Sequence, residues 1–221
     1  MDYSELRSAE TWIFDLDNTL YDASSNLFAQ ISARMTDFIA DLLALDRRSA
    51  FDLQKKYFHK YGTTLRGLMQ CHQIDPHVFL DRVHDIDLGV IDQDPALDAA
   101  LSGLDGRKVI FTNGSNHHAS RIIGRLGIAE HFSAIFDIVD AGFVPKPAPE
   151  VYRHLIDRLD IQASRAVMVE DMACNLKPAA DLGMTTVWVR TQTDWGREGS
   201  EGDYIDHRLD CLSDWLNALP A

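Results

Sequence analysis

The fold is decided by residues 12–21, which read Trp12-Ile13-Phe14-Asp15-Leu16-Asp17-Asn18-Thr19-Leu20-Tyr21. A short apolar run leads directly into two carboxylates that are two positions apart. At about 4 Å, two like charges repel by roughly 4 kcal/mol at an effective dielectric constant of 20. A folded site can hold such a pair only with a cation, or by protonating one partner. We therefore expect a buried strand that ends in a charged site.

The composition indicates a globular protein without a membrane span. The chain has 221 residues, of which 46% are hydrophobic and 25% charged, enough for one large domain or a domain with a smaller companion. No apolar run is long enough to cross a bilayer, and Met1–Glu5 lacks the start of a signal peptide. Three widely spaced cysteines, Cys71, Cys174 and Cys211, are typical of a reducing compartment. We expect a cytoplasmic protein.

The net charge of −13 limits the possible partners. Nucleic acids and anionic membranes need basic patches, so neither is expected as a partner. A small anionic substrate is still compatible, because one lysine and a bound metal can reverse the field inside a pocket.

Alternating patterns predict an α/β fold with a doubly wound, Rossmann-like parallel sheet. Apolar runs rich in β-branched residues predict strands at Trp12–Phe14, Val109–Thr112, Ala166–Val169 and Thr185–Val189, with a weaker run at Ala134–Val139 and a short edge strand at Tyr204–His207. Helical patterns lie between them, at Pro95–Leu104, Asn116–Leu126, Pro149–Leu159 and Ala173–Leu182.

Residues 23–94 interrupt this alternation with an all-helical pattern. Leu27, Ile31, Phe38 and Ile39 follow helical spacing, with Ser24 or Ser25 as the expected cap, and three more helical segments follow. We expect a core formed by residues 1–22 and 95–221, and a helical cap at 23–94 that selects the substrate.

Polar residues follow each of four predicted strands or the loop after it. They are Asp15 and Asp17, then Thr112-Asn113-Gly114, then Lys146 between two prolines, and last Glu170-Asp171. In open α/β sheets the ligand lies beyond the carboxyl ends of the strands. Each motif alone is common in turns and helix caps, but four of them at successive strand ends indicate one site.

This combination favours phosphoryl transfer. A phosphate dianion cannot approach carboxylates unless a cation removes the repulsion, and Mg²⁺ is the cation that carboxylates and phosphate prefer. Lys146 would add positive charge, and Thr112, Asn113 and Gly114 would hold the phosphoryl oxygens.

Two carboxylates then divide the chemistry. Asp15 would attack phosphorus and form an aspartyl-phosphate intermediate. Asp17 would protonate the departing oxygen and later take a proton from water. The sequence thus predicts a magnesium-dependent phosphomonoesterase that acts on a small phosphorylated metabolite.

Other polar and aromatic residues receive ordinary interpretations. Asn175 could support Asp171 from outside the site. We interpret most histidines of the cap as surface or packing residues; these are His59, His72, His77 and His84. The pair His117-His118 is interpreted as a solvated first turn of a helix. The stretch Asp194–Asp203, which contains Trp195, is interpreted as an exposed loop.

At these motifs the chain resembles the haloacid dehalogenase-like superfamily of phosphatases, over nearly its whole length. The matching residues are Asp15, Asp17, Thr19, Thr112, Lys146, Glu170 and Asp171. The resemblance implies Asp15 as nucleophile and Asp17 as acid and base. It also implies magnesium bound by the side chains of Asp15 and Asp171 and the main-chain carbonyl of Asp17, with Glu170 nearby. The dehalogenases lack the second aspartate, so dehalogenation is not expected here.

A narrower similarity is to the pyrimidine 5′-nucleotidase branch, which removes phosphate from nucleoside monophosphates such as UMP and CMP. It rests on Asn18 and Tyr21 in the first motif and on the stretches Tyr61–Leu65, His84–Asp87 and Glu170–Leu176. Phosphoglycolate, a sugar phosphate, a phosphomutase reaction or a non-catalytic ligand-binding module are alternatives that the sequence leaves open, as it does the oligomeric state.

Overall fold

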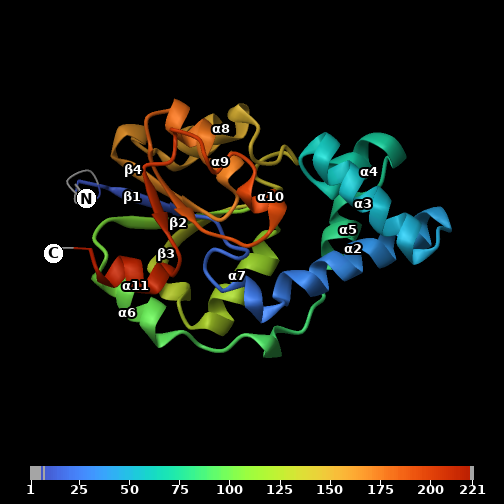
Figure 1. Cartoon of the computed structure of the whole chain (residues 1–221), viewed down its shortest axis with the longest axis horizontal. Coiled ribbons are helices and arrows are strands. Elements are labelled where there is room, and N and C mark those ends of the chain that lie inside the picture. The colour runs from blue at the N-terminus through green and yellow to red at the C-terminus, as the bar shows by residue number, and fades with distance from the viewer. Residues whose placement is uncertain (1–5, 7, 220–221) are drawn as a thin grey trace.

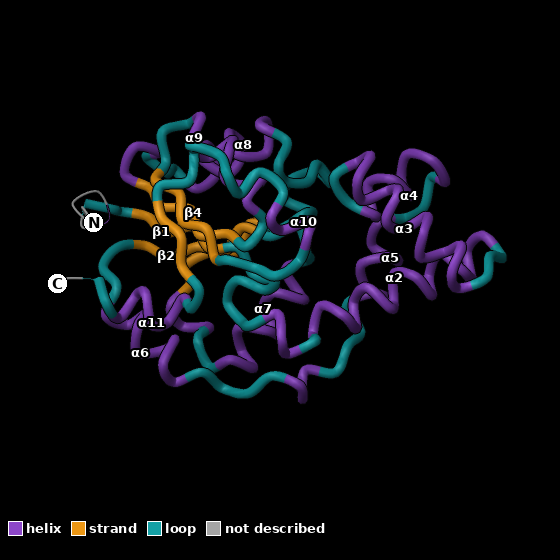
Figure 2. Tube along the Cα trace, viewed as in Figure 1, coloured by secondary structure: helices purple, strands orange, loops and turns teal. Residues whose placement is uncertain are grey.

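A six-stranded, all-parallel sheet forms the centre of the molecule, as the computed structural model shows for residues 6 and 8–219 (Figures 1 and 2). The strands are β1 (Thr11–Phe14), β2 (Arg107–Phe111), β3 (Phe132–Phe136), β4 (Ala166–Glu170), β5 (Thr185–Val189) and β6 (His207–Leu209). Their order is β3-β2-β1-β4-β5-β6, which is the doubly wound order. The predicted fold class is therefore confirmed, while the expectation about Met1–Glu5 lies outside the described residues.

Helices cover both faces of the sheet (Figure 1). On one face lie α8 (Pro149–Leu159) and α9 (Ala173–Asp181), and on the other α6 (Pro95–Gly103), α7 (Asn116–Leu126) and α11 (Leu212–Asn217). Along β1 the side chains alternate, so that Ile13 packs toward α8 and α9 whereas Trp12 and Phe14 pack toward the other layer. Three short elements connect these strands and helices: η3 (Ala129–His131), η4 (Ala163–Arg165) and α10 (Asp194–Arg197).

Two predictions about the C-terminal part are wrong. The edge strand begins at His207 and not at residue 204. The residues before it form hydrogen bonds that involve the side chains of Thr186 and Asp206, and the regular main-chain pairing with β5 starts only at His207. The Thr186 hydroxyl donates to the Tyr204 carbonyl at 2.6 Å, and the Asp206 carboxylate accepts from the Thr186 amide at 2.8 Å. The expected loop at 194–203 begins with the helix α10.

The segment between β1 and β2 is helical, and in this part of the described chain there is no strand. It contains η1 (Ala23–Ser25), α2 (Leu27–Leu43), α3 (Arg47–Tyr61), α4 (Thr64–His72), α5 (Pro76–Val83) and η2 (Leu88–Val90). We call residues 23–94 the helical insert. Asn26 directly precedes α2 and its side chain makes no capping bond. The hydroxyl of Ser25, one of the two expected caps, accepts from the amide of Leu27, the first residue of α2, at 3.3 Å. As Figure 1 shows, α2 to α5 lie to one side of the sheet, beyond α7 and α10.

The insert is not packed separately from the sheet. One apolar cluster contains Trp12 and Phe14 of β1 together with Leu27, Ile31 and Phe79 of the insert. Within the described residues, no helix is long and apolar enough to cross a membrane. The three cysteines form no disulfide.

Candidate active site

One pocket brings the predicted site residues together at the carboxyl ends of the strands. Its lining contains Asp15, Asp17, Thr112, Asn113, Gly114, Lys146, Glu170, Asp171 and Asn175. Thr19 lies just behind it and donates its hydroxyl proton to Asp15 Oδ2 at 3.1 Å. Residues from four separate stretches of sequence thus meet in one place.

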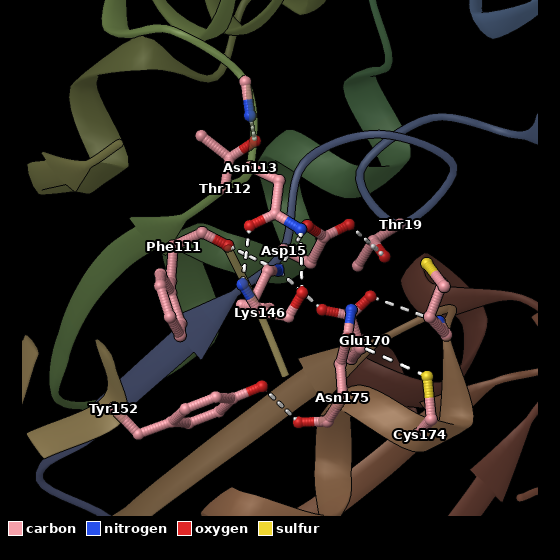
Figure 3. A network of polar contacts seen from close by, with 12 residues as sticks. Asp15, Thr19, Phe111, Thr112, Asn113, Lys146, Tyr152, Glu170, Cys174 and Asn175 are labelled. Carbon is pink, nitrogen blue, oxygen red and sulfur yellow. Dashed lines mark hydrogen bonds and ion pairs between the residues drawn. The ribbon is translucent and has the colours of Figure 1, made fainter. Parts of the chain in front are cut away.

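Lys146 occupies the centre of this group (Figure 3). Its ammonium donates to Asp15 Oδ1 and to Glu170 Oε2, both at 2.7 Å, and to the Phe111 carbonyl at 2.8 Å. Only 2% of the lysine is exposed. Such charge-assisted bonds fix the ammonium between the two carboxylates.

Asn113 holds the segment that carries this lysine. Its side-chain oxygen accepts from the Lys146 amide at 2.8 Å, and its side-chain nitrogen donates to the Lys146 carbonyl at 3.4 Å. Both ends of the side chain are therefore engaged with the main chain. Contact between this side chain and a phosphoryl group stays a prediction.

The carboxylates around Lys146 outnumber the available positive charge. Burial and the nearby Glu170 raise the pKa of Asp15 to about 7, although Lys146 acts in the opposite direction. Burial, Glu170 and Asp15 raise the pKa of Asp171 well above its ordinary value. Burial alone would lower the pKa of Lys146, but its two carboxylate partners outweigh this and raise it. The site is short of a cation.

The donor atoms fit a divalent metal ion. Asp15, Glu170 and Asp171 each offer a carboxylate oxygen, and these oxygens all lie within 4.8 Å of one another. All three residues are buried. A set made only of oxygen ligands suits Mg²⁺ better than a softer metal. Asp171 is also held in place, because the indole N–H of Trp188 donates to its carbonyl at 2.8 Å.

The side chain of Asp17 is directed to a different set of partners. The Tyr21 hydroxyl donates to Asp17 Oδ1 at 2.6 Å, and His118 Nε2 lies 3.0 Å from the same oxygen. Burial would raise the pKa of Asp17, but the charge and hydrogen bond of His118, with that of Tyr21, lower it below its ordinary value. Asp17 is thus the carboxyl group that is held apart from the cluster around Lys146.

The interpretation of His118 as a solvated residue is wrong, because only 1% of it is exposed. The sequence did contain a signal. His118 precedes Ile122 by four residues and Leu126 by eight, so it lies on the buried face of α7. His84 of the insert, interpreted as a surface or packing residue, is also buried and lines the pocket.

The turn after β2 leads into the N-terminus of α7. The Gly114 amide donates to the Thr112 hydroxyl at 2.9 Å, and α7 begins two residues later. A Cβ atom on Gly114 would lie 3.3 Å from Thr112 Oγ1 and 3.2 Å from His118 Cδ2, which is closer than side chains normally pack. Glycine is therefore the residue that fits this turn without displacing its neighbours, beside a helix N-terminus, where anions bind well. Because the Gly114 amide and the Thr112 hydroxyl bind each other, their contact with a phosphoryl group stays a prediction.

The end of the pocket that faces the insert is largely apolar. Its lining includes Phe28, Ile31, Met35, Phe58, Leu65, Phe79, Leu80 and Val83, together with Lys55 of α3. Trp195 of α10 completes it, and the Lys55 ammonium lies 5.0 Å from the centre of its ring. Interpreting Trp195 as an ordinary loop residue is therefore wrong. Asn175 also borders the pocket, and the Tyr152 hydroxyl donates to its carbonyl at 2.6 Å, whereas its support of Asp171 stays a prediction.

Comparison with known proteins identifies relatives of this chain. The sequence model of one protein family, the haloacid dehalogenase-like hydrolases, matches residues 10–183. Phosphate metabolism protein 8 of Saccharomyces cerevisiae is 27% identical over 79% of this chain, which spans 60% of the length of that relative. Glyceraldehyde 3-phosphate phosphatase of Pyrococcus abyssi is 27% identical, with 80% of this chain and 79% of the relative covered. Among solved structures, a phosphatase from Thermococcus onnurineus has a TM-score of 0.62 at 18% identity and covers 94% of this chain and 96% of its own.

Proposed function

Because the chain belongs to the haloacid dehalogenase-like hydrolases, we propose that it is a magnesium-dependent phosphomonoesterase that acts on pyrimidine nucleoside monophosphates. One observation carries the proposal: a pocket whose charged end contains Asp15, Asp17 and Lys146 continues into an apolar end formed by the insert. The charged end suits a phosphate, and the apolar end suits a flat organic leaving group.

Transfer would take place in two steps. A carboxylate oxygen of Asp15 attacks phosphorus while the bond between phosphorus and the ester oxygen breaks. Asp17 gives its proton to that oxygen, and the alcohol leaves. Water then attacks the phosphoryl group and loses a proton to Asp17, the bond to Asp15 breaks, and inorganic phosphate leaves.

Charge explains how Asp17 could obtain its proton. In the free protein its pKa is low, but an incoming phosphate dianion raises it, because like charges disfavour the ionised form. Lys146 would keep Asp15 ionised as it attacks. Asp15, Asp171 and the Asp17 carbonyl, with Glu170 nearby, would hold magnesium, which would neutralise the charge that the ester and the carboxylates share.

The apolar end of the pocket supports the choice of substrate. Phe58 and Trp195 offer aromatic surface against which a base could lie, and such stacking contributes about 1–3 kcal/mol per base. Glycolate or glyceraldehyde would leave much of this surface without contacts. We therefore expect a nucleoside to bind better than a small polar leaving group.

A panel of monophosphates with magnesium tests the proposal through release of inorganic phosphate. UMP and CMP are expected to exceed phosphoglycolate, glyceraldehyde 3-phosphate and hexose phosphates in kcat/KM by at least about 10-fold. A higher value on any of the other esters would refute the nucleotide substrate but not the chemistry. Absence of hydrolysis of every ester, p-nitrophenyl phosphate included, would refute the phosphatase. A product that keeps its phosphate would indicate a mutase.

Replacing Trp195 with Ala is expected to raise KM for UMP by about 10-fold, with kcat and thermal midpoint nearly unchanged. The half-buried ring lines the pocket and lies outside the apolar cores. Phe51→Ala is a matched control, because Phe51 also lies beneath the Lys55 ammonium, at 5.1 Å, but does not line the pocket. Equal effects of the two substitutions would attribute the change to Lys55 and not to the indole.

Magnesium is expected to stabilise the protein more at about pH 8 than at about pH 5, because the site binds metal only when its carboxylates are ionised.

The metal-free protein should show the opposite dependence on pH. Without metal, the pKa of Asp15 is 3.8 in the unfolded chain and about 7 in the folded protein. Between these values the folded state binds more protons, so its free energy of unfolding falls as the pH rises. Thermal midpoints in chelator and in excess magnesium measure this, and Asp15→Asn should flatten the fall. An increase in thermal midpoint with magnesium that is the same at about pH 5 and about pH 8 would contradict the prediction about the metal.

A further inference from the structure

The two histidines His84 and His118 form a contact between the insert and the core directly behind Asp17. Their rings are stacked, with centroids 4.2 Å apart and planes inclined by 9°. His118 comes from α7, and His84 from the end of α5 in the insert. Neither residue is required by the two chemical steps described above.

The contacts to Asp17 distinguish its two oxygens. Tyr21 and His118 both bind Oδ1, at 2.6 Å and 3.0 Å. A Cβ atom on Gly114 would lie 3.8 Å from Oδ2, so Oδ2 lies toward the turn that is proposed to hold the phosphoryl group. An oxygen that accepts two hydrogen bonds has little capacity left for a proton. The proton exchanged with substrate would therefore reside on Oδ2.

His118 is itself fixed from several sides. The Ser115 hydroxyl accepts from its amide at 3.3 Å, and His84 Nδ1 lies 3.0 Å from the same hydroxyl. The stack with His84 covers one face of the His118 ring, and Asp17 Oδ1 lies 3.0 Å from its Nε2. Burial and the neighbouring His118 lower the pKa of His84 to about 3, so the ring is uncharged at neutral pH.

The end of α5 is also bound to α7 through its main chain. Arg121 donates to the His84 carbonyl at 2.9 Å and to the Ile86 carbonyl at 3.1 Å. His84 therefore has a defined position relative to α7, which carries His118. Of these two histidines, His118 is the one that lies within hydrogen-bond distance of Asp17.

We infer that His118 is a positioning residue for Asp17 and that His84, supplied by the insert, holds His118 in place, so that the insert helps to set which oxygen of Asp17 faces the reacting ester. This inference rests on the proposed function, because it takes Asp17 as the acid and base. It assigns the insert a part in proton transfer in addition to substrate selection.

Leaving-group dependence distinguishes positioning from a general structural role. An alkyl ester such as UMP needs a proton on its departing oxygen, whereas p-nitrophenolate leaves without one. In single turnovers, His118→Ala is expected to slow alcohol release from UMP, or from the best alkyl ester of the panel, by about 100-fold. Release of p-nitrophenolate in the first turnover should fall by less than about 5-fold, followed by slow turnover because the second step also needs Asp17.

Matched variants separate this role from others. His117→Ala changes the exposed neighbouring histidine and should behave as the wild type. His118→Gln, which can still donate near the position of Nε2, should recover part of the loss and serves as the test variant if His118→Ala does not fold. His84→Phe keeps a ring for stacking and should lose less activity than His84→Ala.

A double-mutant cycle with Asp17→Asn decides the outcome. If His118 acts through Asp17, adding His118→Ala to Asp17→Asn should cost less than about 3-fold further. Full multiplication of the two effects, or equal losses for the alkyl and aryl esters, would overturn the inference while leaving the proposed function intact. If Asp17→Asn itself kept the wild-type rate on alkyl esters, the proposed role of Asp17 would be refuted, and the inference with it.

Discussion

Replacing Asp15 with Asn is expected to lower kcat by at least about 10⁴-fold, because an amide cannot serve as the nucleophile. The fold should persist. The substitution removes one of three crowded carboxylates, so the free energy of unfolding without metal should stay the same or rise above that of the wild type at pH 8. Phosphate release and chemical denaturation measure the two effects.

Asp52→Asn is the matched control, since Asp52 is exposed on α3 and does not line the pocket. It should keep both the rate and the stability of the wild type. Turnover by Asp15→Asn at more than a tenth of the wild-type rate would contradict the covalent route. Trapping the phosphorylated wild-type protein in acid, with none formed by the variant, would support it independently.

Replacing Lys146 with Met is expected to have the largest effect on stability. It leaves Asp15 and Glu170 without their shared ammonium in a buried site, and breaking a buried ion pair in this way costs about 3–5 kcal/mol. Chemical denaturation in chelator measures the loss, which should be smaller at pH 5, where Asp15 accepts a proton. Turnover should fall as well, because Lys146 would compensate the charge of the attacking carboxylate.

Two further variants make this prediction specific. Lys177→Met removes an exposed lysine paired with Asp181 and should change stability by less than about 0.5 kcal/mol. Adding Glu170→Gln to Lys146→Met should restore part of the loss, because the second carboxylate disappears with its partner. A cost of less than about 1 kcal/mol for Lys146→Met would show that the buried charges relax without the lysine.

Local sequence was sufficient to predict most of the sheet and its helices. Strand β5 has the predicted bounds, because a short continuous run rich in β-branched residues is typical of a buried parallel strand. Helices α7 and α8 match as well, since Pro149 opens α8 and Gly127, at a φ of 80°, ends α7. The short edge strand β6 was misplaced, because side-chain bonds from another strand decide where it begins.

The predicted site residues converge because the carboxyl ends of parallel strands meet at one edge of the sheet. The partners of Asp17 were not predicted from its neighbourhood, since His118 is 101 positions away in the chain. The buried state of His84 likewise depends on a stack between two separate helices. Pattern reasoning identifies chemical groups at strand ends, whereas the groups that orient them come from tertiary contacts.

Some residues that line the pocket also belong to the apolar core, and others do not, so substitutions at the two groups should differ in their effect on stability. Ile31, Phe79 and Val83 border the pocket, yet each is at most 1% exposed and belongs to the apolar cluster that also contains β1. Remodelling them for a new leaving group would leave voids in the interior and weaken the whole molecule. Lys55, Phe58 and Trp195 lie outside that cluster. Adaptation to other metabolites should therefore begin at these three positions, where a change of selectivity carries little risk of misfolding.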